Sequence, residues 1–303
     1  MFAIETVGLT KHYGDVQALA GVDLRVPAGS IFGFLGPNGA GKTTAMRILV
    51  GLLRASGGQA TVLGRDVWRE STAIRRDVGY LPGDVRLYEW MTGRRFAAWC
   101  DAMRGDGGWG EIDRLARRLD LNLDRRIRNY SRGMKQKLGL IASLAHRPKL
   151  LILDEPTTAL DPLVQQTLYD ELRSAASKGR TVLFSSHTLS EVELLCDRVA
   201  IIRAGRIIAD SSIADLRARA VRRVELRMTD DELRKAVFPK DWIDGSSRDG
   251  AVLGSWRGPV DGLLAWLGSL KLQDVAIGAP DLEDLFAAYY REDTPAPGKE
   301  ARS

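Results

Sequence analysis

A short glycine-rich segment constrains this chain more than any other part of its sequence. Residues 36–44 read Gly-Pro-Asn-Gly-Ala-Gly-Lys-Thr-Thr, and residues 36–43 match the phosphate-binding pattern G-x-x-x-x-G-K-[ST]. The apolar run Ser30–Leu35 before it is typical of a buried strand, and residues 44–50 after it are typical of a helix. Strand, glycine loop and helix in this order predict a P-loop site for a nucleoside triphosphate.

The residue types of this loop suit a polyphosphate, which carries several charges that many donors must meet at short range. Glycines allow backbone N–H groups to close around the phosphates, and the helix that begins near Gly41 adds its free amides and positive dipole end. Lys42 can reach the β and γ phosphates, and the Thr43 hydroxyl can bind Mg²⁺. The predicted nucleotide-binding residues are Gly36, Pro37, Asn38, Gly39, Ala40, Gly41, Lys42, Thr43 and Thr44.

Two carboxylates follow a second apolar run. Leu150–Leu153 has the composition of a central parallel strand, and Asp154 and Glu155 come directly after it. We expect Asp154 to hold Mg²⁺ through water and Glu155 to polarise the water that attacks the γ phosphate. A carboxylate here could also be the N-cap of a helix that follows a core strand.

Two further segments extend the pattern. A strand at Thr181–Ser186 ends at His187, which should face the same phosphates because ligands lie beyond the carboxyl ends of parallel strands. A histidine in this place could also be a purely structural residue. Residues 129–137 open a helix, which Ser131 can cap and in which Gly133 allows close approach.

The order of these motifs resembles the nucleotide-binding subunits of ATP-binding cassette (ABC) transporters, of the bacterial exporter-type (ABC-2-like) branch. The resemblance runs from about Phe2 to Asp210. It implies an α/β P-loop NTPase core, in which Tyr13 stacks on adenine and Tyr130–Gln136 is the signature segment. In this family two cassettes form a head-to-tail dimer around two ATP molecules, so Ser131, Gly133 and Asp161 would complete or contact the partner's site.

The resemblance also implies an activity and its partners. The chain would bind ATP and Mg²⁺ and hydrolyse ATP with Lys42, Glu155 and His187 as catalytic residues. It would work as a homodimer or a cassette heterodimer on separate transmembrane permease subunits. No run of about 18 apolar residues and no secretory signal are visible, which favours the cytoplasm. The resemblance implies a peripheral place at the inner face of the membrane.

Two positions depart from the family pattern. The common signature Leu-Ser-Gly-Gly-Gln is replaced by Tyr130-Ser131-Arg132-Gly133-Met134, which keeps the serine and the second glycine. After residues 78–82, where the family places a glutamine that touches magnesium, this chain has Gly83 and then Asp84. Asp84 is therefore a candidate metal ligand, provided that the loop shifts by one residue.

Composition and spacing predict a division of the chain. We expect an ATPase domain at 1–210 with a helical subdomain at about 86–140, a small α+β domain at 211–292 and a disordered tail at 293–303. The small domain contains expected strands at 223–227 and 274–277, strand candidates around 251–256, and helices at 232–237 and 260–270, followed by a last helix from Pro280. A β-α-β-β-α-β order is one arrangement that fits these elements.

Two other functions are compatible with the sequence, one because of its charge and one because of the missing glutamine. The net charge is +5, and residues 1–210 hold 30 basic against 23 acidic residues, with many of the arginines between Arg86 and Lys137. These could form a solvated helical face or a docking surface. A cassette ATPase acting on ribosomes or DNA would also be basic, but we expect no nucleic acid partner, because such proteins usually carry two cassettes or a coiled-coil insertion. The missing glutamine would also suit a nucleotide-sensing module with weak hydrolysis.

Overall fold

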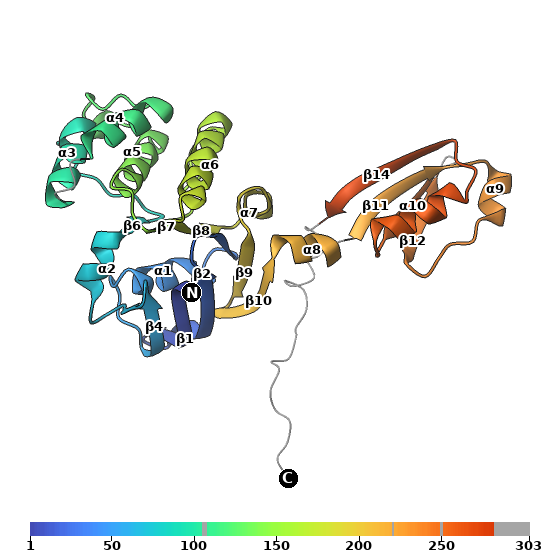
Figure 1. Cartoon of the computed structure of the whole chain (residues 1–303), viewed down its shortest axis with the longest axis horizontal. Coiled ribbons are helices and arrows are strands. Elements are labelled where there is room, and N and C mark those ends of the chain that lie inside the picture. Colours follow the sequence, from blue (N-terminus) through green and yellow to red (C-terminus); the bar gives the residue numbers. More distant parts are fainter. Residues whose placement is uncertain (105–107, 220, 249–250, 282–303) are drawn as a thin grey trace, which may run out of the picture. The chain divides into compact units, whose positions relative to one another are not determined.

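The computed structural model describes residues 1–104, 108–219, 221–248 and 251–281 (Figure 1). Met1–Ser211 form one compact unit, and the described residues from Ser212 onwards form a second. This division lies one residue from the domain boundary predicted at 210. No helix in the described ranges is long and apolar enough to span a bilayer.

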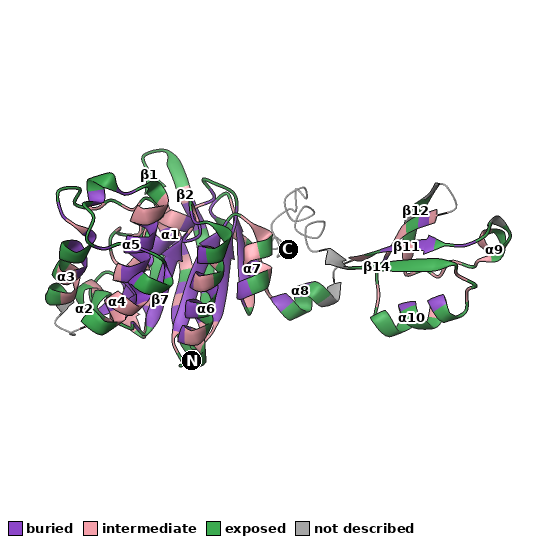
Figure 2. Ribbon diagram, turned by 90° about the horizontal axis from the view of Figure 1, so that it is seen from above, coloured by how far each residue is buried: buried purple, intermediate pink, exposed green. Residues whose placement is uncertain are grey.

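The first unit contains a six-stranded sheet in the order β10-β9-β3-β8-β7-β6. Its central neighbours β9, β3, β8, β7 and β6 pair in parallel. Because these strands are covered on both faces, most of their residues are apolar, and Figure 2 shows them buried. The strands are β3 (Ile31–Leu35), β6 (Val78–Leu81), β7 (Leu150–Asp154), β8 (Thr181–Ser186), β9 (Arg198–Arg203) and β10 (Arg206–Ser212).

A smaller antiparallel sheet, ordered β2-β1-β4-β5, lies on the other side of helix α1 (Lys42–Leu49). Helix α1 contacts β7 of the large sheet and both β2 and β4 of the small one. Its buried side chains, such as Met46 and Ile48, join one core with residues from both sheets, and this packing fixes the P-loop before it. The strands are β1 (Phe2–Tyr13), β2 (Val16–Pro27), β4 (Gly57–Val62) and β5 (Arg65–Asp66).

Helices surround these sheets and form a subdomain of their own. Helices α3, α4 and α5 contact one another and lie together in Figure 1, whereas α6 and α7 contact β3 and β8. The helical region was predicted to end at about 140, but α5 continues to Leu144 because its buried apolar face extends that far. The helices are α2 (Ser71–Asp77), α3 (Gly93–Arg104), α4 (Trp109–Arg118), a 3₁₀ turn (Ile127–Asn129), α5 (Arg132–Leu144), α6 (Pro162–Ser177) and α7 (Leu189–Leu195).

An ion-pair cluster ties the helical subdomain to helix α6. Glu171 of α6 is nearly buried, and its two carboxylate oxygens accept hydrogen bonds from Arg114 of α4 at 2.8 and 2.7 Å. Arg118 of α4 lies 2.9 Å from the same carboxylate. These contacts raise the pKa of Arg114 further above its usual range, so the charge persists at any relevant pH. The pairs fix α4 against the helix that begins after Asp161.

The second unit has the predicted β-α-β-β-α-β order, preceded by helix α8 (Ile213–Arg219). Its four strands form an antiparallel sheet in the order β12-β13-β11-β14, and Val224, Leu226, Trp256 and Leu263 share its core. The elements are β11 (Val221–Arg227), α9 (Asp230–Lys235), β12 (Trp242–Arg248), β13 (Ala251–Trp256), α10 (Val260–Gly268) and β14 (Asp274–Asp281).

Several boundaries in this unit differ from those predicted. Helix α9 ends at Lys235 rather than at 237, and α10 ends at Gly268 rather than at 270. Strand β12 was not placed from the sequence, because its serines and glycine weaken the alternation of apolar residues. Strand β14 runs through Pro280 and Asp281, where the start of a helix was expected. The other residues of that expected helix and the tail expected at 293–303 lie outside the described residues.

Candidate nucleotide site

The predicted phosphate loop lies between β3 and α1, at the carboxyl end of the sheet. Gly41 has φ 108°, and a Cβ there would lie 2.7 Å from the carbonyl oxygen of Ala18, so only glycine fits this position. The loop borders a hollow of about 180 Å³. Its lining consists of Ala18, Pro37, Asn38, Gly39, Ala40, Gly41, Lys42, Thr43, Thr44 and Glu155. A phosphate chain would meet the α1 amino end and these backbone amides there.

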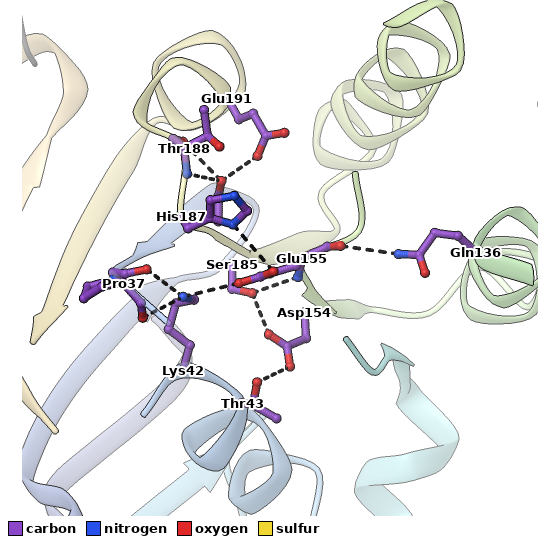
Figure 3. Close-up of polar contacts among 12 residues, drawn as sticks. Pro37, Lys42, Thr43, Gln136, Asp154, Glu155, Ser185, His187, Thr188 and Glu191 are labelled. Carbon is purple, nitrogen blue, oxygen red and sulfur yellow. Dashed lines mark hydrogen bonds and ion pairs between the residues drawn. The ribbon is translucent and has the colours of Figure 1, made fainter. Parts of the chain in front are cut away.

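Lys42 is held at the edge of this hollow with only 5% of its surface exposed. Its Nζ donates to the carbonyl oxygens of Gly36 at 2.6 Å and Pro37 at 3.2 Å, and it lies 3.4 Å from Glu155 Oε1 (Figure 3). The backbone of the phosphate loop therefore positions the ammonium group of Lys42. One charge that would face the phosphates is thus placed beside the acid expected to activate water.

Asp154 is buried at the end of β7 and is held from both sides. The Thr43 hydroxyl donates to Asp154 Oδ2 at 2.6 Å, and the Ser185 hydroxyl donates to Asp154 Oδ1 at 2.8 Å. The two residues predicted to hold Mg²⁺ are therefore in direct contact. A hydroxyl and a carboxylate supply the hard oxygen ligands that Mg²⁺ prefers.

Glu155 follows in a left-handed backbone conformation, with φ 47°. This conformation is uncommon for a residue with a side chain and is found at functional sites when the surroundings enforce it. Its Oε2 lies 3.5 Å from His187 Nδ1, and Gln136 donates to its carbonyl oxygen at 3.3 Å. The glutamate thus lies between Lys42 and His187, as Figure 3 shows.

The signature segment and the segment around Asp161 lie against each other. Ser131 caps α5 by accepting a hydrogen bond from Met134 N, and Asp161 caps α6 by accepting one from Val164 N. A Cβ on Gly133 would lie 2.5 Å from the Ala159 carbonyl oxygen. This close approach within one chain explains why residue 133 is a glycine. The resemblance implies a second reason, which is contact with a partner.

Two predicted residues, Tyr13 and Asp84, are not among those that line this hollow. Tyr13 is at the end of β1 with its ring half exposed, and Lys11 Nζ lies 5.2 Å from the ring centroid. The Asp84 side chain is 68% exposed and pairs with Arg86 Nε at 2.8 Å, whereas the backbone of Gly83 is the part that approaches Asp154. A Cβ on Gly83 would lie 3.3 Å from Asp154 Oδ2. The Asp84 carboxylate thus does not reach the site in this conformation.

Sequence reasoning missed two contributors to this arrangement. Ser185 bridges Asp154 and Glu155, and Glu191 accepts a hydrogen bond from Ser186 next to His187. Both residues were visible as polar groups in or after an apolar strand. The partners of Ser185 depend on the pairing of β7 with β8, whereas Glu191 contacts Ser186 because α7 begins shortly after β8. The structure of the site therefore depends on strand register as well as on motifs.

Comparisons with known proteins agree with this geometry. The sequence profile of the ABC transporter family matches residues 19–158. The chain is 42% identical over 221 residues to the daunorubicin resistance ATP-binding protein DrrA3 of Streptomyces coeruleorubidus, covering 71% of this chain and 70% of that protein. The chain belongs to the ATP-binding proteins of ABC transporters. The predicted family and its ATPase activity are thereby confirmed.

Other relatives extend the similarity. An uncharacterized ABC transporter ATP-binding protein of Synechocystis, sll0415, is 33% identical and covers 95% of this chain and 85% of its own length. Among solved structures, an ATP-binding subunit of an ABC transporter aligns with a TM-score of 0.66 at 29% identity, over 71% of this chain and 92% of that one. The ABC cassette fold predicted from the sequence is therefore confirmed.

Proposed function

We propose that this ABC ATPase powers an exporter by ATP-driven closure of a cassette dimer on separate permease subunits. The observation that carries this proposal is the convergence of Lys42, Asp154, Glu155 and His187 at the carboxyl ends of three adjacent strands. A bacterial Atm1-family ABC exporter with ATP bound supports the proposal, since it aligns with a TM-score of 0.63 and 27% identity over 70% of this chain and 39% of that one.

In the proposed mechanism, Lys42 and the amides of the loop hold the β and γ phosphates, and Glu155 polarises the attacking water. His187 contacts Glu155 and would stabilise the γ phosphate region. Thr43 and Asp154 would hold Mg²⁺, which neutralises charge on the transferred phosphoryl group when it is bound. Within the described residues, no group of three or more His, Cys, Asp or Glu could hold a metal. Phosphate oxygens and water would thus complete its ligands.

The second half of the proposal is the partner cassette. Ser131, Gly133 and Asp161 form a continuous edge through the Gly133 and Ala159 contact, and this edge would meet the ATP held by another cassette. Two solved neighbours of this fold, about 20% identical, are described as dimers. The cassettes would lie at the inner face of the membrane as peripheral subunits. Their closure over ATP and their opening after hydrolysis would then drive the conformational change of the permease.

The helical subdomain supplies a surface for that permease. Trp90 is 60% exposed, Tyr88 and Trp99 are also exposed, and the ring of Tyr88 contacts those of Trp90 and Trp99. Arg95 lies over the Trp90 ring, 5.2 Å from its centroid. Trp90 is therefore a surface residue and not part of the core. Exposed, clustered aromatic residues mark interaction sites.

Co-purification with membrane proteins tests the proposed function. Affinity capture of the chain from its own membranes should recover a permease, and Trp90→Ala should weaken that recovery, by roughly 30-fold in affinity if Trp90 is a hot spot worth about 2 kcal/mol. Trp68→Ala is a matched control, because Trp68 is also exposed and stacked by an arginine but lies outside the helical subdomain. Recovery of ribosomes or DNA in place of a permease would contradict the proposal.

We also propose Asp84 as a magnesium ligand after a shift of its loop, because Gly83 has no side chain for that role. Asp84→Ala should raise the Mg²⁺ concentration needed for half-maximal ATPase activity by about 10-fold. Arg86→Ala removes only the present partner of Asp84 and should not raise this concentration. If the Mg²⁺ dependence of Asp84→Ala equals that of the parent protein, Asp84 is not a ligand.

A further inference from the structure

Ser185 occupies an unusual place in the large sheet. It lies near the end of β8, and its side chain is completely buried. Its hydroxyl donates to Asp154 Oδ1 at 2.8 Å and accepts a hydrogen bond from Glu155 N at 2.9 Å (Figure 3). One hydroxyl therefore contacts both of the consecutive acidic residues.

Strand pairing explains how one small side chain can do this. Strands β7 and β8 run in parallel with Asp154 opposite Ser185, so the two side chains project from adjacent strands at the same level. A hydroxyl can donate one hydrogen bond through its proton and can accept hydrogen bonds through its lone pairs. The Ser185 hydroxyl donates a hydrogen bond to Asp154 and accepts one from the Glu155 amide, so it acts as donor and acceptor at the site.

The contact with Asp154 fixes the rotation of a carboxylate. Ser185 holds one oxygen, and the Thr43 hydroxyl holds the other at 2.6 Å. With both oxygens engaged, the carboxylate plane cannot turn without losing a buried hydrogen bond. The carboxylate is thereby oriented toward the residue that would share Mg²⁺ with it.

The contact with Glu155 fixes a backbone turn. Glu155 has φ 47°, a conformation that needs support from its surroundings. The Ser185 hydroxyl satisfies its amide, while Gln136 donates to its carbonyl oxygen at 3.3 Å. This turn is what carries the Glu155 side chain to within 3.4 Å of Lys42 and 3.5 Å of His187.

We infer that Ser185 is a positioning residue for ATP hydrolysis, whose single hydroxyl aligns the metal-binding carboxylate of Asp154 and the water-activating carboxylate of Glu155. It acts through these two residues and touches neither nucleotide nor water in this role. The inference rests on the proposed roles of Asp154 and Glu155. It predicts that a defect at Ser185 appears in turnover and Mg²⁺ dependence more than in ATP binding.

Steady-state ATPase kinetics of the full chain at varied ATP and Mg²⁺ test the inference. Ser185→Ala should lower kcat by about 10- to 100-fold and raise the Mg²⁺ concentration for half-maximal activity, with KM for ATP changed less than threefold. Ser185→Thr keeps the hydroxyl and should recover most of kcat. Ser185→Cys fills the same space with a weak donor and should resemble the alanine variant, which separates orientation from packing.

A buried serine elsewhere in the same unit provides the matched control. Ser143 on α5 is 2% exposed, and its hydroxyl donates to the Leu140 carbonyl oxygen at 2.9 Å. Ser143→Ala removes a buried hydroxyl of the same kind and should leave kcat and Mg²⁺ dependence unchanged. A kcat for Ser185→Ala or Ser185→Cys that matches that of Ser143→Ala would overturn the inference.

The outcomes separate this inference from the function on which it rests. If Glu155→Gln abolishes turnover while the alanine and cysteine variants of Ser185 keep normal turnover, the inference alone fails. If Glu155→Gln keeps normal turnover, the proposed role of Glu155 is wrong, and the inference that rests on it is wrong as well. Loss of activity in all three Ser185 variants, including threonine, with unchanged Mg²⁺ dependence would show a packing role and would also overturn the inference.

Discussion

Glu155→Gln should reduce ATP turnover by at least roughly 100-fold and should trap the chain as a dimer with ATP enclosed. General base catalysis contributes about 10²- to 10⁴-fold in enzymes, and glutamine cannot accept the proton of the attacking water. The amide also removes the negative charge that lies 3.4 Å from Lys42 Nζ. ATP would then bind and close the dimer, but the step that reopens it would be lost.

Light scattering with and without Mg-ATP, combined with measurement of retained nucleotide, checks this result. Glu171→Gln is a useful control, because Glu171 is also a nearly buried carboxylate with basic partners but lies between α4 and α6, outside the nucleotide site. It should lower thermal stability and should not accumulate the ATP-bound dimer. Normal turnover in Glu155→Gln would show that another group activates the water.

Lys42→Ala should weaken ATP binding by roughly 10- to 100-fold, because a charged hydrogen bond to the phosphates is worth about 1.5–3 kcal/mol. The buried ammonium is already oriented by the carbonyl oxygens of Gly36 and Pro37, so little ordering is needed when the phosphates arrive. Equilibrium binding of a fluorescent ATP analogue, displaced by ATP, measures the change.

Lys137→Ala is the matched control for that variant. Lys137 is also buried, and its Nζ donates to the Asp120 carbonyl oxygen at 3.4 Å, away from the phosphate loop. Loss of this lysine should alter stability and leave ATP affinity close to that of the parent chain. Equal loss of affinity in both variants would mean that Lys42 has no specific role at the phosphates.

Much of the first unit could be predicted from the sequence because its motifs are local. The spacing of Gly36 to Thr43 specifies the loop, and uninterrupted apolar runs specify β3, β7 and β8 with the polar residues that follow them. Cap residues Ser131 and Asp161 mark the starts of α5 and α6. Each of these signals lies within a few consecutive residues.

Contacts between strands and loops could not be predicted in the same way. Fully buried strands lack the alternation that reveals register, so the sequence does not show that Ser185 lies opposite Asp154. The approach of Gly133, in the first turn of α5, to the Ala159 carbonyl oxygen joins two segments that are not neighbours in the sequence. In the second unit, the weak pattern of β12 concealed a strand because its serines and glycine resemble a loop.

If a second chain completes the nucleotide site of the first, ATPase activity depends on dimer formation, and the ATPase rate per chain across a concentration series tests this most directly. If Ser131 and Gly133 complete the partner's site, the rate per chain should rise with protein concentration and reach a plateau when dimers dominate. A rate per chain that stays constant from the nanomolar to the micromolar range, for a chain that light scattering shows to be a monomer throughout, would contradict the claim.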